Sequence, residues 1–507
     1  MTRKRRREAN SSKVAETGPA LGRAWFGSRP RFWIAWAAAA LLLRIILILA
    51  TPGSIYHSDH DDYVRWGIQA TDEGILTLYD KPPPRHDMRV PGERGAVITQ
   101  RAMDRVCNYP PLATYLLYGS GLIFRAVSAD RLINTITSRF LFCGWAMLSD
   151  ILLAAGCAAV VSLLRPGAPG RWTYALMLLA PPFWWDSVIW GQTDTIFLAP
   201  AVWMLYAMLR QRWLLAGVLW GIALGLKPQG VLLLPVWCLA ILMTRPPRRV
   251  LAGAVMAALV LFIGAAPFLA HSGWAWFRVS YQENFSSAYA NFTTLKAFNI
   301  WYLDVLISDS TDATQTWLGL SKARWGDIFL AVGLLAGFLL VIWRWRRDMR
   351  GLIPWTGLAL LAFVMLPTRV HERYLILTLP FLAIATAMSR RVWPGLVALA
   401  IVVMAQMSWP LWLKSSPGQT SQIADETTRR YAELQARAAA HPEQKLPSLE
   451  DVIRSRQADY RQNRMKSLDL EWTCTILALL GAAAAAAALL TLSPQKHDAG
   501  AHRPREK

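Results

Sequence analysis

Apolar runs close to the length of a membrane-spanning helix recur along most of this chain. A helix needs about 20 apolar residues to cross the hydrocarbon core of a bilayer. Of the 507 residues, 54% are hydrophobic and only 17% are charged, whereas charged residues make up roughly a quarter of a typical soluble protein. The sequence therefore predicts an all-α polytopic membrane protein.

The basic residues indicate how these runs alternate across the bilayer. The formal net charge of +21 would suggest a nucleic-acid partner in a soluble protein. Here the tendency of Lys and Arg to stay in cytoplasmic loops explains it better, so we expect no nucleic acid. The basic residues gather in short segments: Arg3 to Arg7, Arg165 and Arg171, Arg210 and Arg212, Arg245 to Arg249, Arg344 to Arg350, Arg390 and Arg391, and Lys496 to Lys507.

Placing all of these segments in the cytoplasm requires an even number of crossings between neighbours. About 12 transmembrane helices satisfy this condition (about 11 to 14 are compatible with the pattern). The apolar run from Leu112 to Phe124 breaks the parity if it crosses, so we expect an external re-entrant or interfacial helix there. The predicted spans are 33–51, 139–164, 172–184, 195–209, 213–226, 230–244, 250–270, 327–343, 352–367, 374–388, 392–412 and 472–492.

This topology divides the chain into a transmembrane module with tails and long external loops. The module covers 33–412, and its two long external loops cover 52–138 and 271–326. A third external loop, polar and with helical patterning around Glu426 to Arg437 and Asp451 to Arg464, covers 413–471. The last transmembrane helix follows at 472–492. We expect cytoplasmic tails at 1–32 and 493–507. The five cysteines show no metal-type spacing, which predicts buried apolar side chains and no disulfide framework.

The motifs whose side chains suit catalysis or binding fall on the external face in this topology. An acidic cluster, His57-Ser58-Asp59-His60-Asp61-Asp62, follows the first predicted span. Ionisable residues at membrane depth indicate a functional site. Each motif alone has a simpler explanation, such as loop solvation, helix capping, a turn, an aromatic belt or snorkelling. The hypothesis of a functional site therefore rests on the fact that all of these motifs lie on one side of the membrane. The other candidates are Trp66, Tyr109, Trp185, Asp186, Gln192, Asp194, Lys227, Asn284, His371 and Arg373.

Sugar transfer from a lipid phosphate uses this combination of groups. A carboxylate accepts the proton of the acceptor hydroxyl as that oxygen attacks the anomeric carbon. Cations stabilise the phosphate that leaves, while aromatic rings and amides hold the sugars in place. Lys227 is a candidate phosphate partner on charge alone.

The motifs resemble those of the polytopic glycosyltransferases of the GT-C superfamily, which use polyprenyl-phosphate sugars. The chain looks closest to bacterial relatives of GPI mannosyltransferase II, and it is also similar to the glucosyltransferases that extend dolichol-linked oligosaccharide. The matching stretches lie between about residues 33 and 390. They are His57-Ser58-Asp59-His60-Asp61 with Val64-Arg65-Trp66, Asn108-Tyr109-Pro110-Pro111-Leu112, Gly191-Gln192-Thr193-Asp194, Leu226-Lys227-Pro228 and His371-Glu372-Arg373.

The resemblance implies roles for particular residues. It implies that Asp59 is the general base, with Asp61 beside it, and that His371 and Arg373 lie at the donor phosphate. It also implies single displacement with inversion and transfer of a hexose, mannose or glucose. Departures such as Ser58 and Asn108 leave the acceptor open between lipid-linked glycan, polysaccharide and protein, and they leave Asp61 as an alternative base.

We expect no cofactor, because a lipid-phosphate donor needs no nucleotide clamp. Asp59-His60-Asp61 nevertheless matches the Asp-x-Asp of metal-dependent glycosyltransferases, which keeps a divalent metal as an alternative. A transporter or flippase for a lipid-linked or polar solute is the main rival, although its coupling groups usually lie near the bilayer midplane. A partner-binding membrane protein and a lipid phosphotransferase are further alternatives. The Ala- and Arg-rich composition favours a bacterial plasma membrane over the endoplasmic reticulum.

Overall fold

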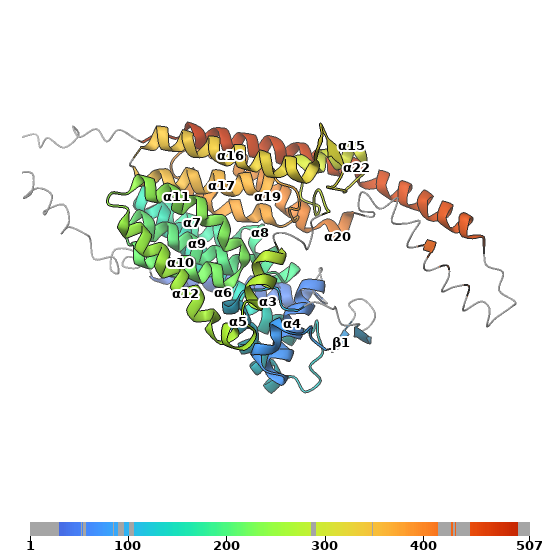
Figure 1. Cartoon of the computed structure of the whole chain (residues 1–507). Helices are drawn as coiled ribbons and strands as arrows, with labels where there is room; N and C mark the ends of the chain where they lie inside the picture. Colours follow the sequence, from blue (N-terminus) through green and yellow to red (C-terminus); the bar gives the residue numbers. More distant parts are fainter. Residues whose placement is uncertain are drawn as a thin grey trace, which may run out of the picture.

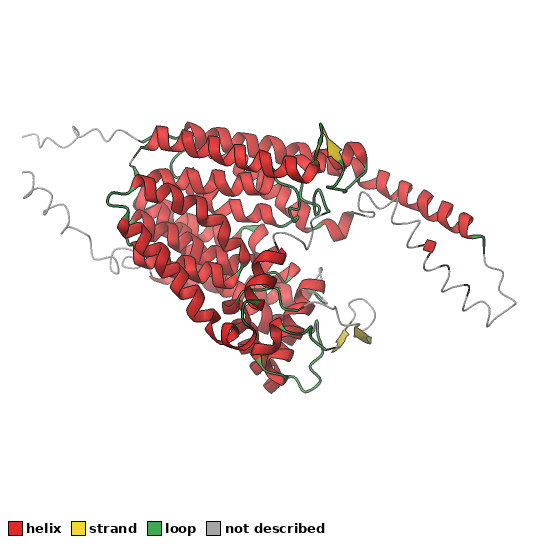
Figure 2. Cartoon of the chain, viewed as in Figure 1, coloured by secondary structure: helices red, strands yellow, loops and turns green. Residues whose placement is uncertain are grey.

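The fold, taken from a computed structural model, consists almost entirely of helices (Figure 2). The structure describes residues 30–51, 53, 57–84, 86–89, 96–100, 106–284, 291–346, 348–413 and 447–494, with positions 427, 428, 431 and 435. Most of the predicted tails therefore lie outside the described residues. The α-helices are α3 (Pro30–Ala50), α4 (His57–Asp72), α5 (Pro111–Val127), α6 (Ile136–Leu164), α7 (Ala168–Leu179), α8 (Pro181–Trp184), α9 (Asp194–Leu209), α10 (Trp213–Leu226), α11 (Leu234–Met243), α12 (Arg248–Ser272), α13 (Ala275–Phe277), α15 (Ile300–Ser308), α16 (Lys322–Trp345), α17 (Leu352–Met365), α18 (Leu379–Thr386), α19 (Trp393–Met407), α20 (Trp409–Trp412) and α22 (Leu449–Thr491).

Short tighter or wider helical turns continue several of these helices. The 3-10 turns are η1 (Ile75–Tyr79), η3 (Pro228–Leu233), η5 (Met349–Gly351), η6 (Tyr374–Thr378) and η7 (Arg390–Val392), and the π-helical turns are η2 (Trp185–Trp190) and η4 (Arg278–Glu283). Two small antiparallel hairpins, which the sequence analysis did not predict, complete the fold. One pairs β1 (His86–Arg89) with β2 (Val97–Gln100), and the other pairs β3 (Thr316–Trp317) with β4 (Leu320–Ser321).

The helices confirm the prediction of an all-α membrane protein. Each of the predicted spans overlaps a helix, and α5 matches the expected external helix at 112–124. Within the described residues, six helices have the length and composition to cross a bilayer, and shorter apolar helices lie between them. The six are Pro30–Ala50, Ile136–Leu164, Arg248–Ser272, Lys322–Trp345, Arg390–Met407 and Leu449–Thr491.

The predicted cytoplasmic segments meet at one end of the helix assembly. The Phe32 and Trp172 rings lie 6.4 Å apart, and Thr244 reaches the Met349 sulfur at 3.8 Å. Arg344 donates a 2.8 Å hydrogen bond to the carbonyl of Thr491, which joins the ends of α16 and α22. These two helices run alongside each other in Figure 1. The contacts agree with the shared side that the positive-inside argument gave to these loops.

Proline residues interrupt the helices near the candidate site. Proline lacks the N–H that continues a helix, and it disfavours the α conformation in the residue before it. Accordingly α7 ends before Pro181, α10 ends before Pro228, and α17 ends shortly before Pro367. The chain segments that follow carry Asp186, Lys227 and Arg373. Because the helices end there, these polar side chains lie in the segments between apolar helices.

Close packing of small residues holds the centre of the assembly together. Gly217 of α10 lies against the carbonyl of Gly253 in α12, where a Cβ atom would collide with the backbone. Small residues let helices approach closely within membranes. This contact fixes α10, whose last residue precedes Lys227.

The last helix extends well beyond its predicted transmembrane part. We expected a span at 472–492, but α22 begins at Leu449 and continues through the second half of the predicted third loop. Buried polar contacts anchor it: Arg464 pairs with Glu471, and Glu471 accepts a 2.6 Å hydrogen bond from Tyr302 of α15. The first turns of α22 project past the other helices (Figure 1).

Candidate active site

Three charged residues from distant parts of the chain form the centre of the candidate site. Asp194 begins α9, and its carboxylate pairs with the Lys227 ammonium that follows α10. The other carboxylate oxygen of Asp194 lies 3.4 Å from Nε of Arg373. All three side chains are at least nine-tenths buried. Burial lowers the pKa of Lys227, but the Asp194 carboxylate and Tyr109 together outweigh burial, and the net shift of the pKa is upward. One buried acid therefore holds two cations close together.

Asp59 joins this cluster from α4. Its carboxylate accepts a hydrogen bond from the Gln192 amide and lies 3.7 Å from Nη1 of Arg373. The Asp59 side chain keeps 23% of its surface exposed, whereas Asp194 is fully buried. Asp59 is thus the carboxylate of this cluster that a ligand in solution can reach.

The Gln192 amide and the Tyr63 hydroxyl connect Asp59 to the Tyr109 hydroxyl by hydrogen bonds. The Tyr63 hydroxyl donates to the Gln192 side-chain oxygen at 2.9 Å and lies 2.6 Å from the Tyr109 hydroxyl. The Lys227 ammonium lies 5.7 Å from the centre of the Tyr109 ring. Tyr63 was not among the predicted site residues. Its position four residues after Asp59 places both on one face of α4, and that spacing was the available signal.

The Tyr109 segment is held in place by three neighbours. The carbonyl of Tyr109 accepts hydrogen bonds from the hydroxyls of Tyr79 and Ser280, at 2.7 and 2.9 Å. The Asn284 amide donates a 2.9 Å bond to the carbonyl of Asn108. Asn284, a predicted substrate-binding residue, therefore holds the loop that carries Tyr109.

His371 and Glu372 form the opposite edge of the cluster. The Nδ1 atom of His371 lies 3.7 Å from the Glu372 carboxylate, which also lies 3.9 Å from Nη1 of Arg373. Burial, outweighing the nearby Glu372, lowers the pKa of His371. The backbone of this edge is fixed by hydrogen bonds to residues 293–295.

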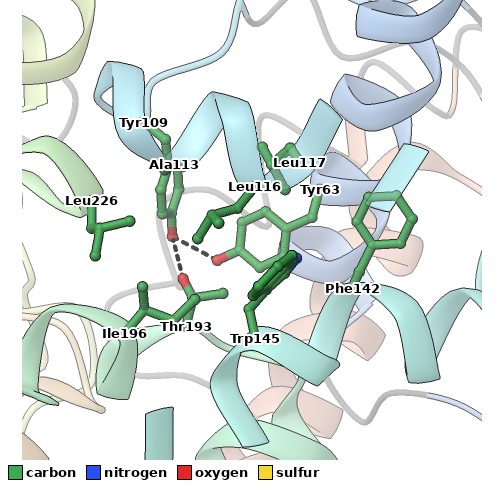
Figure 3. A pocket seen from close by; sticks show the side chains of 10 residues that line it. All are labelled: Tyr63, Tyr109, Ala113, Leu116, Leu117, Phe142, Trp145, Thr193, Ile196 and Leu226. Carbon is green, nitrogen blue, oxygen red and sulfur yellow. Dashed lines mark hydrogen bonds between the residues drawn. The ribbon is translucent and has the colours of Figure 1, made fainter. Parts of the chain in front are cut away.

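A small apolar cleft lies beside Tyr63 and Tyr109. Figure 3 shows the two tyrosine hydroxyls and the Thr193 hydroxyl meeting at its polar end. Leu116 of α5 and Trp145 of α6 lie among its apolar walls. The full lining is Tyr63, Tyr109, Ala113, Leu116, Leu117, Phe142, Trp145, Thr193, Ile196 and Leu226. The hydroxyls at its polar end connect the cleft to Gln192 and so to the charged cluster.

Asp61 lies in a different environment from Asp59. Residues two apart on a helix point to different sides, and Asp61 is 1% exposed with neither carboxylate oxygen hydrogen-bonded. Burial raises its pKa to about 7, against the opposing charge of Arg65. At neutral pH, therefore, a ligand can reach the carboxylate of Asp59 but not that of Asp61.

The remaining predicted residues surround the cluster. Asp186 of η2 is fully buried, and burial together with the Asp194 charge raises its pKa. Trp66 is buried with its ring 6.0 Å from that of Tyr109. Trp185 donates a 3.4 Å hydrogen bond to the carbonyl of Met407. The backbone of His57 begins α4, but its side chain lies outside the described part of the structure.

Asp59, Asp194 and Glu372 each lie within ion-pair distance of Arg373. Among the described residues, no three His, Cys, Asp or Glu side chains converge as a metal site requires. Two buried cations beside a reachable carboxylate are typical of a site that binds an anion and accepts a proton.

Comparisons with known proteins place this chain among glycosyltransferases. The crystal structure of ArnT from Cupriavidus metallidurans bound to undecaprenyl phosphate is similar, with a TM-score of 0.46 and 14% sequence identity over 90% of this chain and 76% of that chain. No curated protein matches the chain. Residues 108–368, about half of the chain, match glycosyltransferase family 87. The chain therefore belongs to glycosyltransferase family 87.

Proposed function

We propose that this glycosyltransferase moves a hexose, mannose or glucose, from a polyprenyl-phosphate donor to an acceptor hydroxyl on the external face of a membrane. The observation that carries the proposal is the reachable Asp59 carboxylate, 3.7 Å from Arg373, with Lys227 and an apolar cleft close by. A lipid phosphate requires both a cationic site and an apolar path.

The phosphate of the donor binds between Lys227, Arg373 and the Tyr109 hydroxyl in this proposal. Lys227 and Arg373 share Asp194, which keeps both cations oriented in a buried place where an unpaired charge would be costly. The first isoprene units of the donor lie in the cleft lined by Leu116 and Trp145. Charge-assisted hydrogen bonds from the cations stabilise the phosphate as its negative charge grows.

Transfer follows a single displacement. The acceptor hydroxyl gives its proton to Asp59 while its oxygen forms a bond to the anomeric carbon. The bond between that carbon and the phosphate oxygen breaks, and its electron pair leaves with polyprenyl phosphate. Attack from the side opposite the phosphate inverts the anomeric configuration. Gln192 orients the base by its hydrogen bond to Asp59.

This scheme needs neither a metal nor a cofactor, because Lys227 and Arg373 supply the positive charge at the phosphate. We place the enzyme in a bacterial plasma membrane with both termini in the cytoplasm, in keeping with the gathering of the basic loops at one end. The acceptor is a lipid-linked glycan, a polysaccharide or a protein.

The test is transfer by the purified full chain in lipid nanodiscs. Polyprenyl-phosphate mannose and polyprenyl-phosphate glucose are supplied in parallel with the corresponding nucleotide sugars, and extracted membrane glycans serve as acceptors. We expect release of polyprenyl phosphate and a product of inverted configuration by NMR. Transfer from the nucleotide sugars alone, or retention of configuration, would contradict the proposal.

A further inference from the structure

Lys296 is a cation beside the site that the proposed reaction has not used. Its ammonium lies 3.9 Å from the centre of the Trp409 ring, at the start of α20. Its backbone bridges to His371. The His371-Glu372-Arg373 segment is therefore attached directly to Lys296.

The backbone at this edge is strained. Lys296 and Arg369 both adopt left-handed conformations, with φ of +63° and +66°, which non-glycine residues rarely take. The two segments hold each other: the amide of Leu295 donates to Val370 at 2.9 Å, and that of Glu372 donates to Leu295 at 3.0 Å. Strain of this kind persists where the surrounding structure enforces it, often at binding sites.

The charge of Lys296 is not balanced by a carboxylate at ion-pair distance among the described residues. Lys227 and Arg373 each have a carboxylate within ion-pair distance. Among the described residues, no carboxylate lies within 4.0 Å of the Lys296 ammonium, although the side chain is half-buried. Glu372 acts on it from farther away and is shared with His371 and Arg373. The Trp409 ring stabilises the cation without neutralising it.

Lys296 is not needed by the donor in the proposed reaction. The donor phosphate already has two cations, Lys227 and Arg373, which share Asp194. Lys296 is joined to this cluster through Glu372, which lies 3.9 Å from Arg373. A third cation beside the cluster therefore suits an anionic group of the other substrate, the acceptor.

We propose that Lys296, held over Trp409, binds an anionic group of the acceptor, either a phosphate or a sugar carboxylate. This assignment rests on the proposed function and narrows its acceptor to an acidic glycan or glycolipid. A charged side chain in a half-buried position binds an anion more strongly than a solvated surface lysine does, because water screens it less.

The experiment measures separate KM values for donor and acceptor with the full chain in nanodiscs. Polyprenyl-phosphate mannose or glucose is the donor, and membrane glycans separated by anion exchange into neutral and acidic fractions are the acceptors. The variants are Lys296→Met, Lys296→Arg, and Arg278→Met as a control on the same predicted face, where Arg278 is mostly exposed and pairs with Glu283 at 3.5 Å. Size-exclusion profiles check that each variant folds, and Lys296→Gln replaces Lys296→Met if that variant does not.

We expect transfer to the acidic fraction. Loss of a charge-assisted contact raises the acceptor KM about tenfold or more in Lys296→Met. The donor KM stays within about twofold, and Lys296→Arg and Arg278→Met stay close to the parent. Loss of the product's charge after combined phosphodiesterase and phosphatase treatment identifies a phosphate, and retention of the charge identifies a carboxylate.

Transfer confined to neutral acceptors, or an equal change of both KM values in Lys296→Met, would overturn this assignment alone. Absence of transfer from every polyprenyl-phosphate sugar by the parent chain would overturn the proposed function, and this assignment with it.

Discussion

Replacing Lys227 by Met tests two roles of this buried cation: pairing with Asp194 and binding the donor phosphate. Lys227 is 2% exposed, and its ammonium pairs with Asp194, which is fully buried. Methionine has a similar length and no charge. The substitution leaves the Asp194 carboxylate with Arg373 as its remaining cation, 3.4 Å away.

The structure sets the size of both effects. Removing one partner of a buried ion pair costs about 3–5 kcal/mol of stability. Because Arg373 still faces Asp194, we expect the lower end, about 3 kcal/mol. In the reaction, a lost charge-assisted hydrogen bond to the phosphate costs about 1.5–3 kcal/mol, which corresponds to a fall in kcat/KM of roughly 10- to 150-fold.

A double substitution distinguishes the loss of stability from the loss of phosphate binding. Lys227→Met with Asp194→Asn removes both charges, so we expect thermal inactivation in detergent to return toward the parent's rate. Transfer from the polyprenyl-phosphate donor stays low, because the phosphate still lacks its cation. Recovery of transfer together with stability would show that Lys227 serves only to neutralise Asp194, and would refute its assignment to the phosphate.

Three further predictions address the base and the cleft. The pKa of Asp61 is raised to about 7 from an unfolded value near 3.8, so folding stability falls by about 1.4 kcal/mol per pH unit as pH rises between these values. Asp61→Asn should therefore match the parent's thermal stability near pH 4, exceed it at pH 8 and keep its activity; equal stability at pH 8 would contradict this reasoning. Gln192→Leu removes the hydrogen bond that orients Asp59 and should lower kcat by roughly 10- to 150-fold with the donor KM little changed, as steady-state kinetics would show. Leu116→Trp narrows the cleft and should raise the KM of a long prenyl donor and of a two-isoprene donor alike, because the first isoprene units lie there; an unchanged donor KM would argue against the cleft as the prenyl site.

The sequence predicted the helices well, because their apolar runs are set by the thickness of the bilayer. The parity of the basic loops also placed Asp59, Lys227 and Arg373 on one face, and the structure brings these three into one cluster. Residues so far apart in the chain could be grouped because a membrane offers only two sides.

The pairing inside the site could not be predicted from the sequence. That Asp194 would hold both cations depends on where α9 begins relative to α10, which is set by proline interruptions and by the close contact at Gly217. The unequal exposure of Asp59 and Asp61 depends on how α4 is rotated against its neighbours. Lys296 lies in a loop with no motif, and its contacts with His371 and Trp409 are visible only in the structure.

The most direct test of the central claim compares Asp59→Asn with the parent and with Asp61→Asn. Each purified chain is supplied with a labelled polyprenyl-phosphate mannose or glucose and with membrane acceptors, and initial rates of transfer are measured after folding is checked by size exclusion. General-base catalysis contributes about 10²- to 10⁴-fold, so we predict a loss of that size in Asp59→Asn and near-parent rates in Asp61→Asn. Near-parent transfer by a folded Asp59→Asn variant would contradict the assignment of Asp59 as the base.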